Sequence, residues 1–342
     1  MRYGSGFIAV ALACGCGAES NDGEGDDSST GGSSSGGSAT TLTTTTGASA
    51  SSAGVTSDAT ATSASGTTTD ADTTGADGSS GGGESSSSGG MVGSPGCDGG
   101  AGLAEGEHTF MLDGYDRRYI LRLPQNYTAD QPWPLVFALH GNGGDVSYWD
   151  SPGGVRDIRA AFADEAIVVV AEAIDHQWRD YAADPSTWPA RIELELNYFD
   201  TVLEEARTAL CIDDGNVFSM GFSGGGSFSG VLGCRREYIR AIAVGGSVIY
   251  FEPADCVATP AAWITIGEQE TTADREAYRD FFRDRAGCEA TSTPGSPDGC
   301  VNYDGCDAAT PVTFCSHPAG HEWPSIGTDA TKAFFEQFYL GG

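Results

Sequence analysis

The sequence predicts an α/β fold with a mostly parallel sheet and helices on both faces. Three observations support this fold class. Strand-like and helix-like segments alternate from about residue 97 to the end of the chain, which is typical of βαβ units. This region has the length of one domain. The segment Gly221-Phe222-Ser223-Gly224-Gly225 directly follows an apolar run, as expected where a strand turns into a helix.

Apolar periodicity and turn residues place the individual elements. Two leading strands are expected to pair antiparallel, and the later ones to lie in the parallel part of the sheet. The predicted strands are 108–113, 118–123, 135–139, 167–171, 216–220, 241–245, 262–266 and 312–315. The predicted helices are 154–165, 192–210, 224–233, 274–286 and 328–340.

Composition divides the chain into three parts. Residues 1–16 carry one arginine, a short apolar run and then Cys14 and Cys16. They suit a signal peptide and resemble a bacterial lipoprotein cleavage site. Residues 17–95 are almost wholly Ser, Thr, Gly, Ala and acidic residues, which cannot bury enough apolar surface to order a chain. We therefore expect a disordered tether, with one folded domain at 96–342 and an extracellular or cell-surface location.

Ser223 is the candidate nucleophile. Glycines two residues before and after it leave room for a strained turn, and the following helix N-terminus adds oriented N–H groups. The chain contains 50 glycines, so the five residues alone could also be a flexible loop. The residues that follow Ser223 distinguish a nucleophile turn from a flexible loop, because a nucleophile of this kind requires an acid and then a histidine after it.

His321 is the candidate general base. Of the five histidines, His317 and His321 follow the serine. His321 lies on the loop between the last predicted strand and the terminal helix, where the base of this arrangement is expected. His317 is the alternative.

Glu270 is the candidate acid that would orient the imidazole. It is the third residue after Gly267, which ends the predicted strand 262–266. Glu268 and Asp274 are the alternatives, and each acid considered singly could also be an ordinary solvated side chain.

A glycine-rich loop at residues 140–144 follows the strand 135–139. In hydrolases with such a serine turn, one oxyanion N–H comes from this loop and the other from the residue after the serine. The backbone N–H groups would be those of Asn142 or Gly141, together with Gly224. No phosphate-binding glycine motif is present, and His140 is interpreted as structural.

These motifs resemble the secreted α/β-hydrolase esterases, which include polyhydroxybutyrate depolymerase-like proteins and feruloyl and acetylxylan esterases. The resemblance spans about residues 114–340 and rests on His140-Gly141, the serine turn, Tyr303-Asp304-Gly305-Cys306 and Gly320-His321-Glu322-Trp323-Pro324. It implies an α/β-hydrolase fold with Ser223 as nucleophile and His321 as base. The family acid is usually an aspartate in Gly-x-x-Asp, whereas this chain has glutamate there, at Glu270.

The resemblance implies a serine esterase that acts on feruloyl or acetyl esters of plant polysaccharide, or on 3-hydroxybutyrate polyester. A binding module without activity and a serine peptidase of the same fold are the alternatives. The formal charge of −31 disfavours nucleic acid as a partner. No cofactor is implied, and a membrane contact is expected only through an N-terminal lipid. The sequence leaves the oligomeric state open.

Cysteines and tryptophans complete the predictions. Eight of the ten cysteines lie in the domain, which favours disulfides in an exported protein, and no cysteine or histidine spacing fits a metal site. Two pairs are predicted, Cys211–Cys234 and, with less support, Cys288–Cys306. Tryptophans near strand ends could line the substrate site or fill the core, and Trp323 and Trp178 are the candidates for substrate contact.

Overall fold

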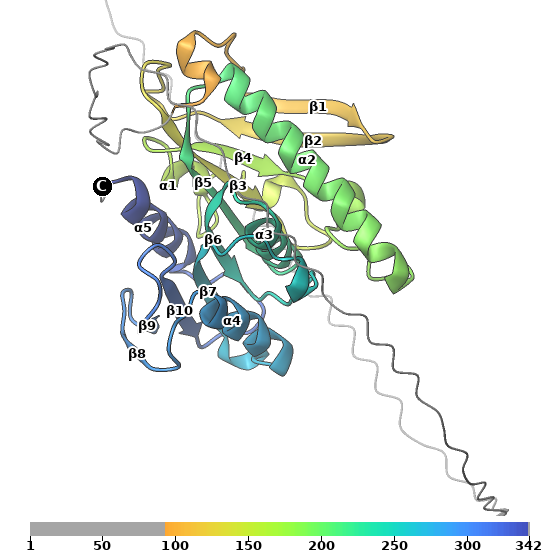
Figure 1. Ribbon diagram of the computed structural model, residues 1–342. Coiled ribbons are helices and arrows are strands. Elements are labelled where there is room, and N and C mark those ends of the chain that lie inside the picture. Colours follow the sequence, from red (N-terminus) through yellow and green to blue (C-terminus); the bar gives the residue numbers. More distant parts are fainter. Residues whose placement is uncertain (1–92, 341–342) are drawn as a thin grey trace, which may run out of the picture. The chain divides into compact units, whose positions relative to one another are not determined.

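The computed structural model describes residues 93–340, in which ten strands form one mixed sheet (Figure 1). Their order is β1-β2-β4-β3-β5-β6-β7-β10-β9-β8. The six strands β4, β3, β5, β6, β7 and β10 run parallel, and an antiparallel hairpin extends the sheet at each end. The bounds are β1 Gly106–Leu112, β2 Tyr115–Arg122, β3 Trp133–Leu139, β4 Ile167–Ala171, β5 Ile212–Phe222, β6 Ile239–Gly245, β7 Ala261–Gly267, β8 Ser292–Pro294, β9 Cys300–Tyr303 and β10 Val312–His317.

Helices cover both faces of the sheet, as the alternating pattern predicts (Figure 1). On one face lie α2 (Trp188–Ala209), α3 (Gly224–Arg235) and α4 (Ala273–Arg285), and on the other α1 (Ile158–Ala161) and α5 (Gly327–Tyr339). All seven residues of β3 are buried. Because side chains alternate along a strand, Phe137 joins the first core and Val136 the second. The two cores hold the central strands rigidly at the edge where the candidate residues lie.

All eight predicted strands are present, and four of the five predicted helices agree to within a few residues. The predicted helix 154–165 is wrong in length, since α1 comprises only four residues. Gly153 and Gly154 have φ values of 80° and 82°, which no α-helix contains. The helix begins instead after Asp157, whose side chain accepts a hydrogen bond from the Ala160 N–H at 3.1 Å. The short strands β8 and β9 were not predicted.

Four disulfides link the eight cysteines of the domain: Cys97–Cys211, Cys234–Cys256, Cys288–Cys306 and Cys300–Cys315. The predicted Cys288–Cys306 pair is confirmed, and the predicted Cys211–Cys234 pair is wrong. Cys211 and Cys234 each pair with a different cysteine. The turn η1 (Pro95–Asp98) brings Cys97 to the start of β5, and the segment after β6 pairs with the end of α3, where Val257 N–H donates to the Cys234 carbonyl at 2.9 Å.

The predicted signal peptide, 1–16, and residues 17–92 of the predicted tether lie outside the described residues. Gly93 and Ser94, also assigned to the tether, pack on the domain. Gly93 bridges to Asp213, and the buried Ser94 hydroxyl donates to the Leu210 carbonyl at 2.8 Å. The ordered domain therefore includes residues slightly before 96. Among residues 93–340, no helix combines the length and apolar character needed to cross a bilayer.

Candidate active site

Ser223 lies at a sharp turn between β5 and α3, with φ 56° and ψ −120°. This strained conformation is rare for a residue with a side chain. Two flanking glycines make it possible. A Cβ on Gly221 would lie 2.4 Å from the Gly225 carbonyl carbon, and one on Gly225 would lie 2.2 Å from the Leu139 carbonyl oxygen. The G-x-S-x-G spacing is therefore a packing requirement of this turn.

Ser223, His321 and Glu270 form a continuous hydrogen-bonded chain. His321 Nε2 lies 2.8 Å from Ser223 Oγ. On the other side of the ring, His321 Nδ1 contacts Glu270 Oε2. With Nδ1 donating its proton to the carboxylate, Nε2 is left as the acceptor for the serine hydroxyl. The structure thus brings together the three predicted residues, which come from three separate loops.

Several donors hold the Glu270 carboxylate in place. The Gly267 N–H donates to Oε1 at 3.3 Å, and Arg275 Nη2 lies 3.0 Å from Oε2. Only 7 % of the side chain is exposed. Burial alone would raise the pKa of Glu270, but the hydrogen bonds from His321 and Gly267 and the nearby positive charges outweigh it, so the pKa lies below its usual range. The carboxylate is therefore ionised at neutral pH.

The alternative residues do not reach the imidazole. Within residues 93–340, neither Glu268 nor Asp274 makes a hydrogen bond with His321, and Glu268 is exposed. His317 is buried at the end of β10, beside Gly267 in β7, and makes no hydrogen bond to Ser223 in this part of the chain.

The loop after β3 lies directly against the serine turn. A Cβ on Gly141 would lie 3.4 Å from Ser223 Cβ, and one on Gly224 would lie 3.1 Å from the Asn142 nitrogen. No group among residues 93–340 accepts a hydrogen bond from the Asn142 or Gly224 N–H. Both N–H groups, which are close to the serine turn, are therefore left without an acceptor in this part of the chain.

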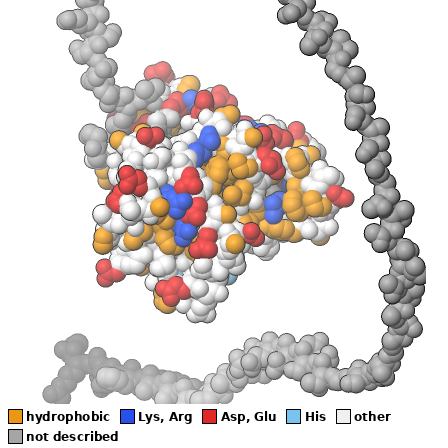
Figure 2. Space-filling view, turned by 60° about the horizontal axis from the view of Figure 1, so that its bottom comes forward, with side chains coloured by type: hydrophobic (Ala, Val, Ile, Leu, Met, Phe, Trp, Pro, Cys, Tyr) orange, Lys and Arg blue, Asp and Glu red, His pale blue; other side chains and the backbone are white. Residues whose placement is uncertain are grey.

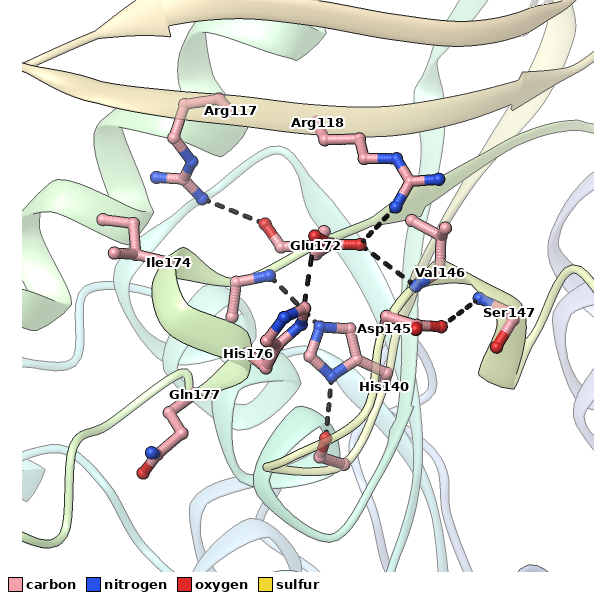
Figure 3. Close-up of polar contacts among 12 residues, drawn as sticks. Arg117, Arg118, His140, Asp145, Val146, Ser147, Glu172, Ile174, His176 and Gln177 are labelled. Atoms are coloured by element: carbon pink, nitrogen blue, oxygen red, sulfur yellow. Dashed lines mark hydrogen bonds and ion pairs between the residues drawn. The ribbon is translucent and has the colours of Figure 1, made fainter.

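His140 anchors this loop through both ring nitrogens (Figure 3). Its Nε2 accepts a hydrogen bond from the Ala173 N–H at 3.2 Å, and its Nδ1 lies 2.7 Å from the Gly141 carbonyl oxygen. This pattern assigns the proton to Nδ1. Burial lowers the pKa of His140, which agrees with a neutral ring. His140 is therefore a structural residue, as the sequence suggested.

The segment after β4 holds the same loop from the side (Figure 3). Gly143 N–H donates to the His176 carbonyl at 2.7 Å, and Val146 N–H to Glu172 Oε2 at 3.4 Å. His176 and Asp175 both have positive φ, 60° and 48°, a strained conformation for residues with side chains. Neither the strained pair nor Glu172 carries a recognisable sequence motif, so sequence reasoning missed both.

The two tryptophans predicted to contact substrate are buried instead. Trp178 has no exposed surface and stacks on Phe199 and Phe228 in the core. Its indole N–H donates to the His140 carbonyl at 2.6 Å, so it supports the loop rather than the substrate. Trp323 is 4 % exposed and packs against Trp149. The prediction that these two side chains contact substrate is therefore corrected: both pack among buried aromatic side chains.

Sequence analysis also missed Arg275, which approaches the histidine and its acid together. Its Nη2 lies 3.1 Å from His321 Nδ1. Because Nδ1 donates to Glu270, this contact is a close approach of two donors, and the carboxylate is the true partner of Arg275. No local pattern marks an arginine five residues after the acid. The part of the chain described contains no group of three or more His, Cys, Asp or Glu side chains that could hold a metal ion.

Curated proteins similar in sequence to this chain include feruloyl esterases. No protein-family model matches it. It is 30 % identical over 247 residues to feruloyl esterase D of Neurospora crassa, covering 67 % of this chain and 82 % of that protein. It is 27 % identical over 262 residues to a probable feruloyl esterase C of Aspergillus niger, covering 71 % of this chain and 90 % of the relative.

A solved structure agrees with the fold. An acetyl xylan esterase from Aspergillus awamori superposes with a TM-score of 0.52 at 14 % identity, over 67 % of this chain and 98 % of that protein. The strand order, the serine turn and the relatives lead to one conclusion. The chain belongs to the feruloyl esterase family of α/β-hydrolases, which are carboxylic-ester hydrolases.

Proposed function

We propose that the domain hydrolyses carboxylic esters through Ser223, His321 and Glu270. The hydrogen-bonded chain from Ser223 Oγ through His321 to the buried carboxylate carries this proposal. In this scheme Ser223 Oγ attacks the ester carbonyl while its proton passes to His321 Nε2. Glu270, already ionised, stabilises the imidazolium that results and keeps the ring in the productive orientation.

The oxyanion of the tetrahedral intermediate then receives hydrogen bonds from the N–H groups of Asn142 and Gly224, with Gly141 as the neighbouring donor. As the intermediate collapses, His321 returns its proton to the leaving alkoxide and an acyl-Ser223 ester remains. A water molecule then replaces the alcohol, with His321 again taking a proton, and the acid is released. The fixed positions of the two N–H groups support this role, because such donors act without reorganisation.

The substrates that we propose are feruloyl or acetyl esters of plant polysaccharide. The relatives named feruloyl esterase support the aromatic acyl group. The four disulfides support an exported protein, because such bonds persist in oxidising compartments. We further propose that residues 1–16 direct export, with lipid attachment at Cys14 or Cys16, and that residues 17–92 tether the domain.

A substrate panel tests the proposal. Purified protein is assayed with methyl ferulate, acetylated xylan and short 3-hydroxybutyrate oligomers, and Ser223→Ala protein serves as the inactive reference. We expect turnover of methyl ferulate or acetylated xylan to exceed that of the oligomers. Preferential hydrolysis of the oligomers would contradict the polysaccharide assignment. Absence of turnover on all three, and on 4-nitrophenyl acetate, would contradict the catalytic assignment itself.

A further inference from the structure

A groove lies beside the candidate oxyanion loop and is not used by the scheme above. Its volume is about 610 Å³, and its lining includes Arg179, Trp188 and Tyr250. These residues follow β4 and β6, the strands on either side of β3 and β5 in the sheet. The Tyr250 hydroxyl lies 3.5 Å from Asn142 Nδ2. The groove is therefore next to the place where the reacting ester would sit.

Arg179 lies at this groove with its guanidinium stacked on aromatic rings. Its Cζ is 3.9 Å from the ring centroid of Tyr250, 4.1 Å from that of Trp188 and 4.5 Å from that of Tyr181. The Asn142 side chain donates to the Arg179 carbonyl at 3.4 Å. Three rings and a backbone contact thus hold the cation in one place, which limits the entropy lost when it binds a ligand.

Within the part of the chain that the structure describes, the guanidinium of Arg179 has no anionic partner. Among residues 93–340, its side chain makes no hydrogen bond or ion pair, and its Nε is buried without an acceptor. The chain as a whole carries 48 acidic and 17 basic residues. The other arginine of the groove, Arg235, lies 2.8 Å from Glu193 and 3.8 Å from Asp255. Only Glu252 remains as an acidic lining residue without such a partner in the groove.

We infer that this groove binds a carboxylate of the substrate remote from the reacting ester, with Arg179 as the receiving group. The planar N–H fork of arginine matches a carboxylate, and such a bond is stronger than one between neutral groups. The exposed aromatic and apolar surface around it suits a sugar or acyl chain that carries the charge. Tyr181 and Val257 are 50 % and 64 % exposed. Figure 2 shows more generally that exposed hydrophobic side chains gather in patches on one face of the domain.

Two parts of a substrate could carry this carboxylate. One is a uronic acid in the polysaccharide, on the alcohol side of the ester. The other is the far end of a dicarboxylic acyl group. The inference rests on the proposed esterase function, and it names the charge that this esterase would select.

Binding without turnover provides the first test. Ser223→Ala protein is titrated by calorimetry with trigalacturonic acid and with its neutral methyl-esterified form. We expect the acid to bind more tightly than the neutral form. Adding Arg179→Gln to the Ser223→Ala protein should weaken binding of the acid by about tenfold or more, because a charge-assisted pair is lost. Arg179→Lys should restore part of it, since the charge returns without the fork.

Arg240→Gln is the matched control for these variants. Arg240 also lies over an aromatic ring, 4.2 Å from the centroid of Phe338, but it is at the start of β6, away from the groove. This variant should leave the preference for the acid unchanged. Far-ultraviolet circular dichroism and the Tm show whether each variant remains folded.

Turnover assays distinguish a carboxylate on the acyl side of the ester from one on the alcohol side. For the acyl side, 4-nitrophenyl hydrogen glutarate is compared with neutral 4-nitrophenyl pentanoate. For the alcohol side, acetate release is compared for acetylated galacturonic acid oligomers and their methyl esters. A preference for the charged member that falls about tenfold in Arg179→Gln, in either pair, supports the site.

The inference is overturned if the Ser223→Ala protein shows no preference for the acid in binding and the wild type shows no preference for the charged substrate in either pair. It is equally overturned if Arg179→Gln retains that preference. Failure of the esterase proposal is seen separately, as absence of wild-type activity on neutral 4-nitrophenyl acetate, and the calorimetric result stands apart from it.

Discussion

Replacing Glu270 by glutamine removes one negative charge and leaves the shape of the side chain almost unchanged. In the wild type, Oε1 accepts from the Gly267 N–H, and Oε2 accepts from His321 and Arg275. All three neighbours donate to the carboxylate. A glutamine amide offers one oxygen and one NH₂ group. Its NH₂ group must therefore face either the Gly267 N–H or the donors of His321 and Arg275.

Both orientations of the glutamine amide damage the site. If the NH₂ group faces His321, Nδ1 must accept, and the proton moves to Nε2, where it faces Ser223 and blocks its role as base. If the NH₂ group faces the Gly267 N–H instead, two buried donors oppose each other and the side chain is pushed out of place. In neither case does a negative charge remain to stabilise the imidazolium.

We expect kcat to fall by roughly 10³- to 10⁴-fold with a similar KM, as when the acid of a serine triad is neutralised. At about 1.36 kcal/mol for each factor of ten, this corresponds to about 4–5.5 kcal/mol of lost transition-state stabilisation. The assay is the hydrolysis of 4-nitrophenyl acetate at several concentrations, with the fold checked by circular dichroism.

Glu268→Gln is the matched control, since it makes the same chemical change two residues earlier on an exposed side chain. It should remain within a few-fold of wild type. The reasoning is refuted if Glu270→Gln stays within tenfold of wild type while Glu268→Gln or Asp274→Asn is inactive.

Three further predictions concern the surroundings of the site. Arg275→Gln removes a positive charge 3.0 Å from Glu270 Oε2 that helps to hold the pKa of this carboxylate below its usual range; the Glu270 pKa should therefore rise, the acid limb of kcat/KM should move to higher pH, and an unchanged profile would contradict this. Gly225→Ala places a Cβ 2.2 Å from a backbone oxygen and should destabilise the domain by several kcal/mol, on the order of the cost of overpacking, as measured by urea unfolding. A protein that begins at residue 91 should keep the Tm of the full chain, whereas one that begins at residue 99 loses Ser94 and Cys97 and should melt several degrees lower, because a long disulfide loop contributes about 4–5 kcal/mol.

The catalytic edge could be predicted because its signals are local or depend only on chain order. The glycines around Ser223 indicate a tight turn, because a Cβ at Gly221 or Gly225 would clash with backbone atoms. A parallel sheet brings the ends of its strands to one edge, so residues after β7 and β10 were expected near the serine. Glu270 and His321 follow those strands, and they do meet.

Other features depend on packing that one sequence does not encode locally. Trp178 follows a strand end, as a substrate contact would, yet the loop after β4 turns it into the core. The pairing of Cys211 was misjudged because it depends on where η1 lies, and no periodicity marks that short turn. Arg275 and Arg179 stand on surface-like stretches of sequence, and their contacts include residues far along the chain, His321 for Arg275 and Tyr250 for Arg179.

The account depends above all on Ser223 being a nucleophile activated by His321. The most direct measurement is labelling with a fluorophosphonate probe followed by peptide mass spectrometry. The wild type should carry the probe on Ser223, and labelling should disappear in Ser223→Ala while it persists in Ser325→Ala, which alters an exposed serine near the histidine loop. Equal labelling of the wild type and the Ser223→Ala protein would contradict the account.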